Sequence, residues 1–195
     1  YSTNHNKIKI DTNELFDNLD KVIGSMPEPM SSQDASAFFL LAREVAKKQK
    51  VVLSGQGADE LFGGYPWYMK MSNEQHTTVI QKFENHYLDR TLNDFKNTIS
   101  SDYTSPNNTT DFIKDSFNVY DSNLTFLDKL LRFDISHLIV DDPIKRVDSM
   151  TMAWGLETRV PFLDQELIEL VCSVSSIDKI TVSYTHLRAH ETDSH

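Results

Sequence analysis

One stretch of this sequence decides its fold: Val51-Val52-Leu53-Ser54-Gly55-Gln56-Gly57-Ala58-Asp59-Glu60-Leu61-Phe62-Gly63-Gly64-Tyr65. It joins a short apolar run to a glycine-rich turn that carries two adjacent acids. Open α/β sheets bind their ligands just beyond the carboxyl end of such a strand. Residues 34–48, which precede the run, have apolar side chains at helical spacing. Helix, strand, glycine turn and a second helix in this order predict the α/β class with a parallel sheet.

The rest of the chain is typical of helix. Between residues 71 and 122 the sequence is polar with widely spaced aromatic residues, which predicts amphipathic helices around a turn at 105–108. We expect Pro143 to interrupt the helical region, because proline lacks a backbone N–H group. The other expected elements are, in chain order, a weak strand at 7–10, a helix from the capping residues 11–13 to Gly24, a helix at 126–138, a helix at 145–155 and a last helix after Asp164.

The glycine-rich turn has the chemistry of an anion site. Gly55 and Gly57 lack a β-carbon, so their backbone can adopt positive φ and a ligand can approach it closely. Asp59 and Glu60 either take part in such a site or only favour the dipole of the helix that follows. The pattern lacks the lysine of a Walker A motif and the G-x-S-x-G frame of a nucleophile elbow. Ser54 is therefore interpreted as a hydrogen-bonding group and not as a nucleophile.

A second block strengthens this interpretation. It reads Asp141-Asp142-Pro143-Ile144-Lys145-Arg146-Val147-Asp148-Ser149-Met150-Thr151-Met152-Ala153-Trp154-Gly155-Leu156-Glu157-Thr158-Arg159-Val160-Pro161-Phe162-Leu163-Asp164. Together the two blocks resemble the synthetase domain of the glutamine-dependent asparagine synthetases. The resemblance implies a partial parallel sheet of the ATP pyrophosphatase (adenine nucleotide α-hydrolase-like) type, followed by a mostly helical region. We expect residues 1–179 to form the distal part of that domain and residues 180–195 to be a non-native tail.

The resemblance also implies a reaction. In that family a substrate carboxylate is adenylated by ATP, pyrophosphate leaves, and ammonia derived from glutamine attacks the acyl-adenylate. ATP and Mg²⁺ are thus the implied cofactors, with Asp59 as the metal ligand and Lys145 as the catalytic, positively charged residue that stabilises the reacting centre. The alternative for Lys145 is a solvated helix face on which it pairs with Asp148, and Glu157 is expected to pair with Arg159. The implied contacts to substrate or ATP are Ser54, Gly55, Gln56, Gly57, Arg146 and Arg159.

Gln56 is a departure from the family pattern at a position that we also count as catalytic. Asparagine synthetases usually have glutamate there, and a neutral amide cannot attract the amino group of free aspartate by charge. The departure, with Trp154-Gly155, is similar to the sister amidotransferases that amidate N-acetylglutaminylglutamine, a dipeptide whose amino group is blocked. The substrate is therefore either aspartate or the blocked dipeptide. A noncatalytic helical assembly module is the alternative from another class.

Composition excludes several other classes of function. The net charge of −10, from 29 acids against 19 bases, argues against nucleic-acid binding. No apolar run approaches the roughly 20 residues of a membrane helix. The single cysteine, Cys172, suits a reducing compartment, so we expect the cytoplasm. The family's serine-glycine-glycine-x-aspartate-serine pyrophosphate loop and its N-terminal glutaminase cysteine do not occur in these residues, and we expect this polypeptide to be inactive by itself.

Overall fold

The computed structural model describes residues 4–28, 32, 34–103 and 108–180, which form two compact units. The first unit takes its residues from 1–57 and 137–164, and the second from 58–136 and 165–195. Of the predicted non-native tail, residues 180–195, all but Ile180 lie outside the described residues, as does most of the predicted turn at 105–108. Ile180 is buried in the core of the second unit.

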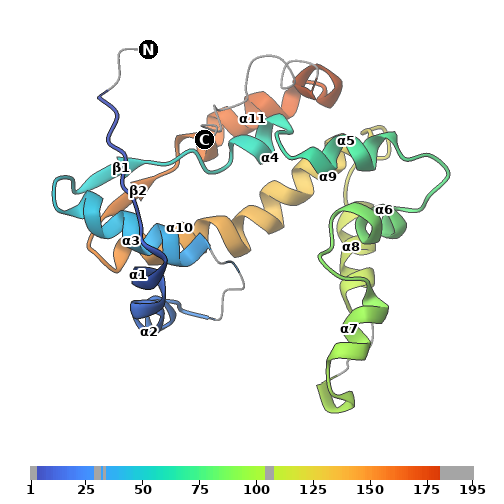
Figure 1. Cartoon of the computed structure of the whole chain (residues 1–195). Helices are drawn as coiled ribbons and strands as arrows, with labels where there is room; N and C mark the ends of the chain where they lie inside the picture. The colour runs from blue at the N-terminus through green and yellow to red at the C-terminus, as the bar shows by residue number, and fades with distance from the viewer. Residues whose placement is uncertain (1–3, 29–31, 33, 104–107, 181–195) are drawn as a thin grey trace. The chain divides into compact units, whose positions relative to one another are not determined.

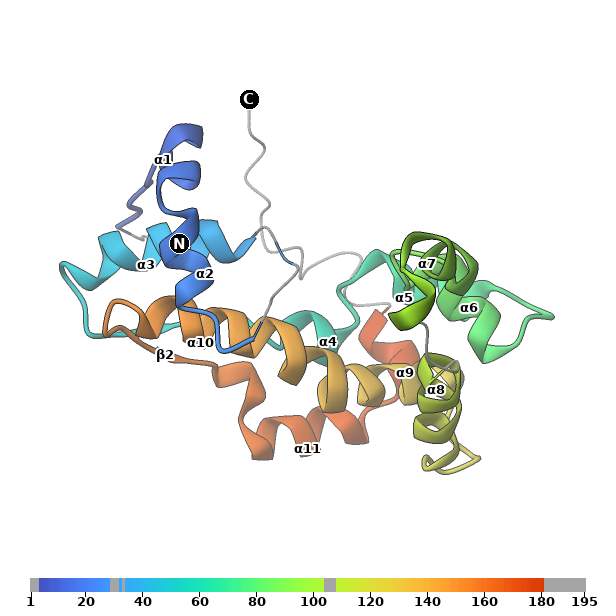
Figure 2. The ribbon, with the colours of Figure 1, turned by 90° about the horizontal axis from the view of Figure 1, so that it is seen from below.

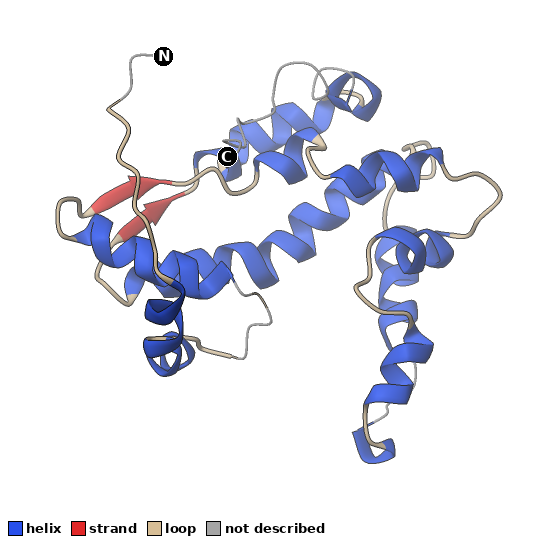
Figure 3. Ribbon diagram, viewed as in Figure 1, coloured by secondary structure: helices blue, strands red, loops and turns tan. Residues whose placement is uncertain are grey.

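The first unit contains a two-stranded parallel sheet, drawn in red in Figure 3. Strand β1 (Val51–Leu53) pairs in register with β2 (Glu157–Arg159), so that Val52 lies opposite Thr158. The strand at 50–53 and the parallel arrangement are thus confirmed, whereas β2 was not predicted. Its sequence, Glu-Thr-Arg, has no apolar alternation that would indicate a strand.

Helices cover one face of this sheet. Helix α3 (Asp34–Ala46) and helix α10 (Lys145–Met152) lie together on that face (Figure 1), and α1 (Thr12–Asp17) and α2 (Leu19–Gly24) pack against α3 (Figure 2). The short 3-10 turn η4 (Pro161–Leu163) follows β2. The buried side chains of the unit's core are Val22, Ala35, Phe39, Leu40 and Met150.

Local sequence explains most of these helices. The Asp11 side chain caps α1 by accepting a hydrogen bond from the backbone N–H group of Asn13 at 2.8 Å. The helix predicted from 11–13 to Gly24 is interrupted at Asn18, where φ is −106° and ψ is 2°, so it forms two short helices. The strand predicted at 7–10 is wrong, because those residues are irregular and the described sheet pairs only β1 with β2.

The prediction that Pro143 interrupts the helical region is also wrong. Pro143 lies inside a π-helical stretch, η3 (Val140–Ile144), that leads directly into α10. In a π-helix the hydrogen bond spans one more residue than in an α-helix, and such bulges accommodate residues that disturb the regular ladder. The helix predicted at 145–155 therefore begins without a break and ends at Met152.

In its described residues the second unit consists of helices joined by turns and loops. Helices α5 and α6 pack against each other, and α9 contacts α4, α5 and α8. The buried core is aromatic and aliphatic, with Tyr68, Phe83 and Leu130 fully enclosed. The helices are α4 (Ala58–Phe62), α5 (Pro66–Asn73), α6 (Val79–His86), α7 (Leu92–Thr98), α8 (Asn108–Asn118), α9 (Phe126–Phe133) and α11 (Gln165–Ser173), with a 3-10 turn η1 (Ser101–Tyr103) and a π-helical stretch η2 (Asp134–Leu138).

These helices confirm the amphipathic segment predicted between 71 and 122, the helix near 126–138 and the last helix after Asp164. The mostly helical architecture with a small parallel sheet agrees with the predicted α/β class. The ATP pyrophosphatase type of sheet stays a prediction. None of the helices in the described ranges combines the length and the apolar character that crossing a bilayer requires.

Candidate functional site

The two sequence blocks meet at the carboxyl ends of the two strands. The backbone N–H group of Ser54 donates a hydrogen bond to the carbonyl oxygen of Arg159 at 2.8 Å. The last paired residues, Leu53 and Arg159, lie opposite each other in the register. Because both strands run in the same direction, the glycine-rich turn after β1 and the segment after β2 leave the sheet at the same edge. That edge is where open parallel sheets bind ligands.

The two glycines at the start of the turn differ in their surroundings. Gly57 has a φ of +93° and is buried, and a β-carbon on it would lie 2.4 Å from the Cδ2 atom of Leu163. Packing within the protein and the positive φ are therefore what require glycine at position 57. Gly55 is exposed, and a β-carbon there would have no neighbour within 4 Å. Of the two positions, only Gly55 leaves its backbone open to a ligand.

Asp59 lies over the glycine pair that ends α4. A β-carbon on Gly64 would lie 1.9 Å from the Oδ1 atom of Asp59, so the carboxylate occupies the space that any other residue at 64 would need. The backbone N–H group of Gly64 also donates to the Asp59 carbonyl oxygen at 3.0 Å. The residue keeps contact with solvent, and partial desolvation of its carboxyl group raises the pKa of Asp59.

Glu60, the second acid of the motif, has a different role from Asp59. It is 1% exposed, and its Oε1 atom accepts a hydrogen bond from the hydroxyl group of Tyr65 at 2.9 Å. Burial is the main cause that raises the pKa of Tyr65, and the negative charge of Glu60 adds to it. The adjacent acids thus point to different surroundings, one toward solvent and one into the core.

Lys145 is held by two carboxylates at the start of α10. Its Nζ atom lies 2.5 Å from Oε1 of Glu28 and 3.2 Å from Oδ1 of Asp141. These hydrogen bonds, the one with Glu28 first, raise the pKa of Lys145. The pairing with Asp148 that the sequence suggested as an alternative is therefore replaced by these two acids. Glu28 lies far away in the sequence, and no local pattern indicated its contact.

Arg146 is packed into the first unit. Its side chain is 10% exposed, and its Nη1 atom donates to both carboxylate oxygens of Asp142 at 3.0 and 3.2 Å. The guanidinium group also lies over the ring of Phe38, with 5.9 Å between its central carbon and the ring centroid. These contacts make Arg146 a packing residue of α10 as much as a candidate for binding phosphate.

Arg159 forms the ion pair that the sequence predicted. Its Nε atom lies 2.8 Å from Oε1 of Glu157, and both side chains are mostly exposed. The backbone carbonyl group of Arg159 therefore lies at the candidate site, where it accepts the hydrogen bond from Ser54. Its side chain instead pairs with Glu157 on the same strand. In the described part of the first unit, the side chains of Lys145, Arg146 and Arg159 pair with carboxylates outside the turn at 54–57.

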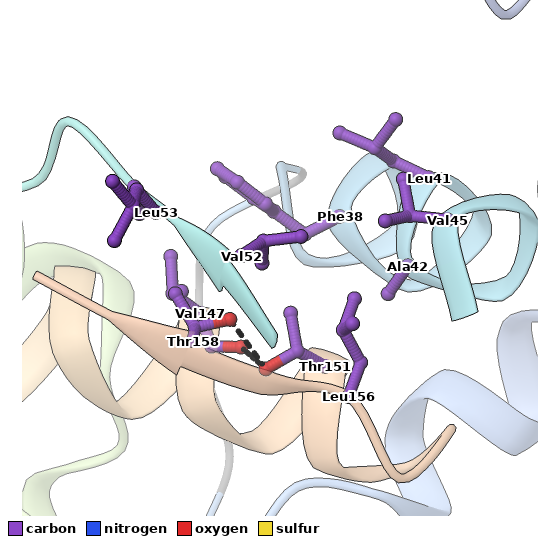
Figure 4. A pocket seen from close by; sticks show the side chains of 11 residues that line it. Phe38, Leu41, Ala42, Val45, Val52, Leu53, Val147, Thr151, Leu156 and Thr158 are labelled. Atoms are coloured by element: carbon purple, nitrogen blue, oxygen red, sulfur yellow. Dashed lines mark hydrogen bonds between the residues drawn. The ribbon is translucent and has the colours of Figure 1, made fainter. Parts of the chain in front are cut away.

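An apolar cavity of about 230 Å³ lies beside the start of the turn (Figure 4). Thr151 and Thr158 contribute its hydroxyl groups, but these bond to each other at 3.0 Å, and Thr151 also donates to the carbonyl oxygen of Val147 at 2.8 Å. Ser54 therefore supplies polar character at the strand end of an otherwise apolar wall. The lining residues are Phe38, Leu41, Ala42, Val45, Val52, Leu53, Ser54, Val147, Thr151, Leu156 and Thr158.

Comparison with known proteins agrees with this arrangement. The family model described as asparagine synthase matches residues 1–185. The chain belongs to the asparagine synthase family. The match covers both sequence blocks and the helices between them, so the strand pairing that joins Ser54 to Arg159 lies within the family's shared region.

Three relatives in this family show how much of a whole protein the chain represents. Asparagine synthetase [glutamine-hydrolyzing] 3 of Bacillus subtilis is 28% identical over 183 residues, which are 89% of this chain and 28% of the relative. Asparagine synthetase [glutamine-hydrolyzing] 1 of Saccharomyces cerevisiae is 26% identical over 90% of this chain and 22% of the relative. A putative asparagine synthetase [glutamine-hydrolyzing] 1 of Methanocaldococcus jannaschii is 33% identical over 69% and 16%. The chain therefore spans less than a third of each of these three relatives.

The residues present fit a magnesium ion that is shared with a nucleotide, as opposed to an ion that the protein encloses by itself. Among the described residues, no three histidine, cysteine, aspartate or glutamate side chains cluster as a metal site would require. Mg²⁺ in nucleotide sites is usually bound by one or two carboxylates together with phosphate oxygens and water. A single solvent-facing carboxylate, that of Asp59, meets this requirement, whereas the enclosed Glu60 does not.

Proposed function

We propose that the intact protein containing this chain is an ATP-dependent, glutamine-hydrolysing amide synthetase. The carboxylate of the substrate attacks the α-phosphorus of ATP, so that pyrophosphate leaves and an acyl-adenylate forms. Ammonia from glutamine then attacks the acyl carbon, and AMP leaves with the former carboxylate oxygen. The observation that supports this most is the hydrogen bond from Ser54 to Arg159, which brings both family blocks to the ligand-binding edge of one parallel sheet.

The turn residues are proposed to bind ATP and the reacting carboxylate. Ser54 and Gly55 lie where the strand ends, and the open space around Gly55 allows a phosphate or carboxylate oxygen to approach its backbone. Gly57 holds the turn against Leu163. The apolar cavity beside Ser54 offers a surface on which a flat ring can pack.

Asp59 is the proposed ligand of Mg²⁺. When bound, the ion neutralises the charge that develops on the leaving pyrophosphate. Lys145 is the proposed positively charged residue that stabilises the reacting centre. Arg146 and Arg159 are proposed phosphate contacts. For Lys145 to act in this way, its ammonium group must be shared with or released from Glu28 and Asp141, which hold it at 2.5 and 3.2 Å.

Gln56 bears on the choice of substrate. Its amide has no charge to attract the ammonium group of free aspartate, so we propose a substrate without a free amino group, of the N-acetylglutaminylglutamine type. Aspartate is the competing candidate, because the relatives are named asparagine synthetases and amidation of the side-chain carboxylate of aspartate gives asparagine. Steady-state assays of the intact protein with each acid decide between them, and a clear preference for aspartate would refute the dipeptide. The single cysteine supports the cytoplasm as the proposed compartment.

The experiment that tests the proposed reaction follows AMP and amide product in the intact protein and its Asp59→Asn variant. The variant keeps the size of the side chain and removes its charge, so we expect at least a hundredfold loss of AMP formation, the scale of removing one charge-stabilising group. Gly64→Ala is the matched second variant, because its β-carbon displaces the Asp59 carboxylate by steric contact alone. It is expected to raise the Mg²⁺ concentration needed for half-maximal rate. Amide synthesis at the parental rate in both variants would show that Asp59 takes no part in the reaction. Absence of AMP and amide formation in the parent itself would favour the noncatalytic helical module.

A further inference from the structure

The second unit encloses a carboxyl group with two phenol donors. Asp134 is 0% exposed, and its two oxygens accept hydrogen bonds from the hydroxyl groups of Tyr68 and Tyr87, each at 2.5 Å. Asp134 begins η2, Tyr68 belongs to α5 and Tyr87 caps the end of α6, so one side chain ties three elements together. Among the described residues, no ion pair neutralises Asp134. Burying a carboxyl group is costly unless it is hydrogen-bonded or paired, and here the two phenol donors meet that requirement.

The hydrogen bond from Tyr68 connects Asp134 to the segment that contains the glycine-rich motif. Helix α5 begins at Pro66, directly after the N-cap residue Tyr65, and Tyr68 lies in its first turn. Tyr65 in turn donates to Glu60 at 2.9 Å, and the rings of Tyr65 and Tyr68 lie 5.7 Å apart. The chain between Glu60 and α5 is thus fixed on both sides by a phenol bound to a buried carboxylate. Within that span lies Gly64, against which the Asp59 carboxylate rests.

We propose that Asp134 is a positioning residue for the metal ligand Asp59, acting through Tyr68 and the start of α5. By holding the first turn of α5, the bond from Tyr68 to Asp134 keeps Gly64 where the Asp59 carboxylate can lie over it without a steric conflict. The inference rests on the proposed function, because it assigns a purpose to the orientation of Asp59. It extends that function to a residue that neither sequence block contains.

The two tyrosines make the inference testable, because they bind the same carboxyl group from different helices. Each hydroxyl group donates to Asp134 at 2.5 Å; Tyr68 is fully buried in the aromatic core, and Tyr87 is partly buried and packs against it. Tyr68 stands at the start of the helix that follows the motif, whereas Tyr87 stands at the far end of α6. If Asp134 has only a structural role, loss of either tyrosine hydroxyl group should affect metal binding in the same way. If Asp134 positions Asp59, loss of the Tyr68 hydroxyl group should affect metal binding more.

The experiment compares Tyr68→Phe with Tyr87→Phe in the intact protein. Binding of the Mn²⁺–ATP complex to the protein is measured from the enhancement of the water proton relaxation rate by protein-bound Mn²⁺, with Mn²⁺–ATP alone as the baseline, and thermal unfolding is followed in parallel. Both variants are expected to lower the melting temperature, Tyr68→Phe by more because Tyr68 is fully buried and Tyr87 is partly exposed, so Mn²⁺ binding is compared at a temperature where both variants are folded. Tyr68→Phe is expected to weaken Mn²⁺ binding by about threefold to tenfold, the range that loss of one hydrogen bond gives. Tyr87→Phe is expected to leave that affinity within about a factor of two.

Equal weakening by the two variants, or no weakening by Tyr68→Phe, would overturn the inference. Asp134→Asn is the second variant in case Tyr68→Phe does not fold, and it is expected to weaken Mn²⁺ binding as Tyr68→Phe does. Asp59→Asn distinguishes failure of the proposed metal site from failure of the positioning role alone. If Mn²⁺ binds with the same affinity to the parent and to Asp59→Asn, the proposed metal site is wrong. If binding needs Asp59 and the two tyrosine variants still behave alike, only the positioning role fails.

Discussion

Gly57 and Leu163 pack so closely that a β-carbon on Gly57 would lie 2.4 Å from the Cδ2 atom of Leu163. The contact joins the turn after β1 to the 3-10 turn after β2, and the φ of +93° at Gly57 adds a second reason for glycine. We therefore expect Gly57→Ala to lower the free energy of unfolding by on the order of 3 kcal/mol, from backbone strain and overpacking. Chemical denaturation of the intact protein measures the change.

Gly55→Ala is the matched control for this substitution. Gly55 has ordinary backbone geometry and open space around the position of a β-carbon, so its variant is expected to unfold within about 0.5 kcal/mol of the parent. Equal destabilisation by both variants would contradict the packing that the structure assigns to Gly57.

Lys145 and Arg146 are neighbours in the sequence but have opposite surroundings. Lys145 lies on the surface with two acidic partners, and Lys145→Gln is expected to leave the melting temperature unchanged while lowering the rate of amide synthesis. Arg146 is packed on Phe38 and bonded to Asp142, so Arg146→Gln is expected to cost about 2 kcal/mol of unfolding free energy.

Lys47→Gln controls for the loss of a surface ion pair, because Lys47 pairs with Glu44 at 2.6 Å near the end of α3. Its variant is expected to match the parent in both melting temperature and rate. If Lys145→Gln behaved like Lys47→Gln in the amide assay, Lys145 would have no part in the reaction.

Asp134 is expected to make stability depend on pH. Burial raises the pKa of Asp134 to about 7, against about 4 in the unfolded chain. The folded protein therefore binds the proton more tightly, so this contribution to stability is fully present below pH 4 and is lost as the pH rises to 7. Across that window the free energy of unfolding is expected to fall by up to about 1.4 kcal/mol per pH unit.

Asp134→Asn removes the titrating group and should remove this slope. Urea denaturation of parent and variant between pH 4 and pH 8 gives the difference in unfolding free energy, which is expected to shift in favour of the variant as the pH rises. A difference that is constant with pH would mean that Asp134 is ionised throughout the range in the folded protein.

The sequence predicted those elements whose signal is local. The apolar spacing of residues 34–48 predicted α3, and the run before Ser54 predicted β1, because each pattern lies within a single element. Strand β2 went unpredicted, since Glu157-Thr158-Arg159 is polar and its conformation depends on pairing with a distant strand. Pro143 was expected to break the helix, and the π-helical hydrogen-bonding pattern that accommodates it has no sequence signature.

The same distinction applies to the candidate site. The glycine pattern indicated the turn, and its requirements for glycine are seen at Gly57, Gly63 and Gly64. The partners of the side chains were not predictable, because Lys145 meets Glu28, and Asp134 meets Tyr68, across long stretches of chain. Which of two adjacent acids becomes buried, Asp59 or Glu60, likewise depends on the fold around α4.

The described residues of the first unit place no helix on one side of the sheet, and this affects how the chain behaves when it is handled alone. Helices cover the side that carries Val52, while Val51 and Leu53 are 41% and 74% exposed. Aliphatic side chains on an uncovered strand with a free edge favour association between copies and cross-strand stacking. Polar substitutions at these two positions are therefore a direct route to a preparation that resists aggregation at high concentration.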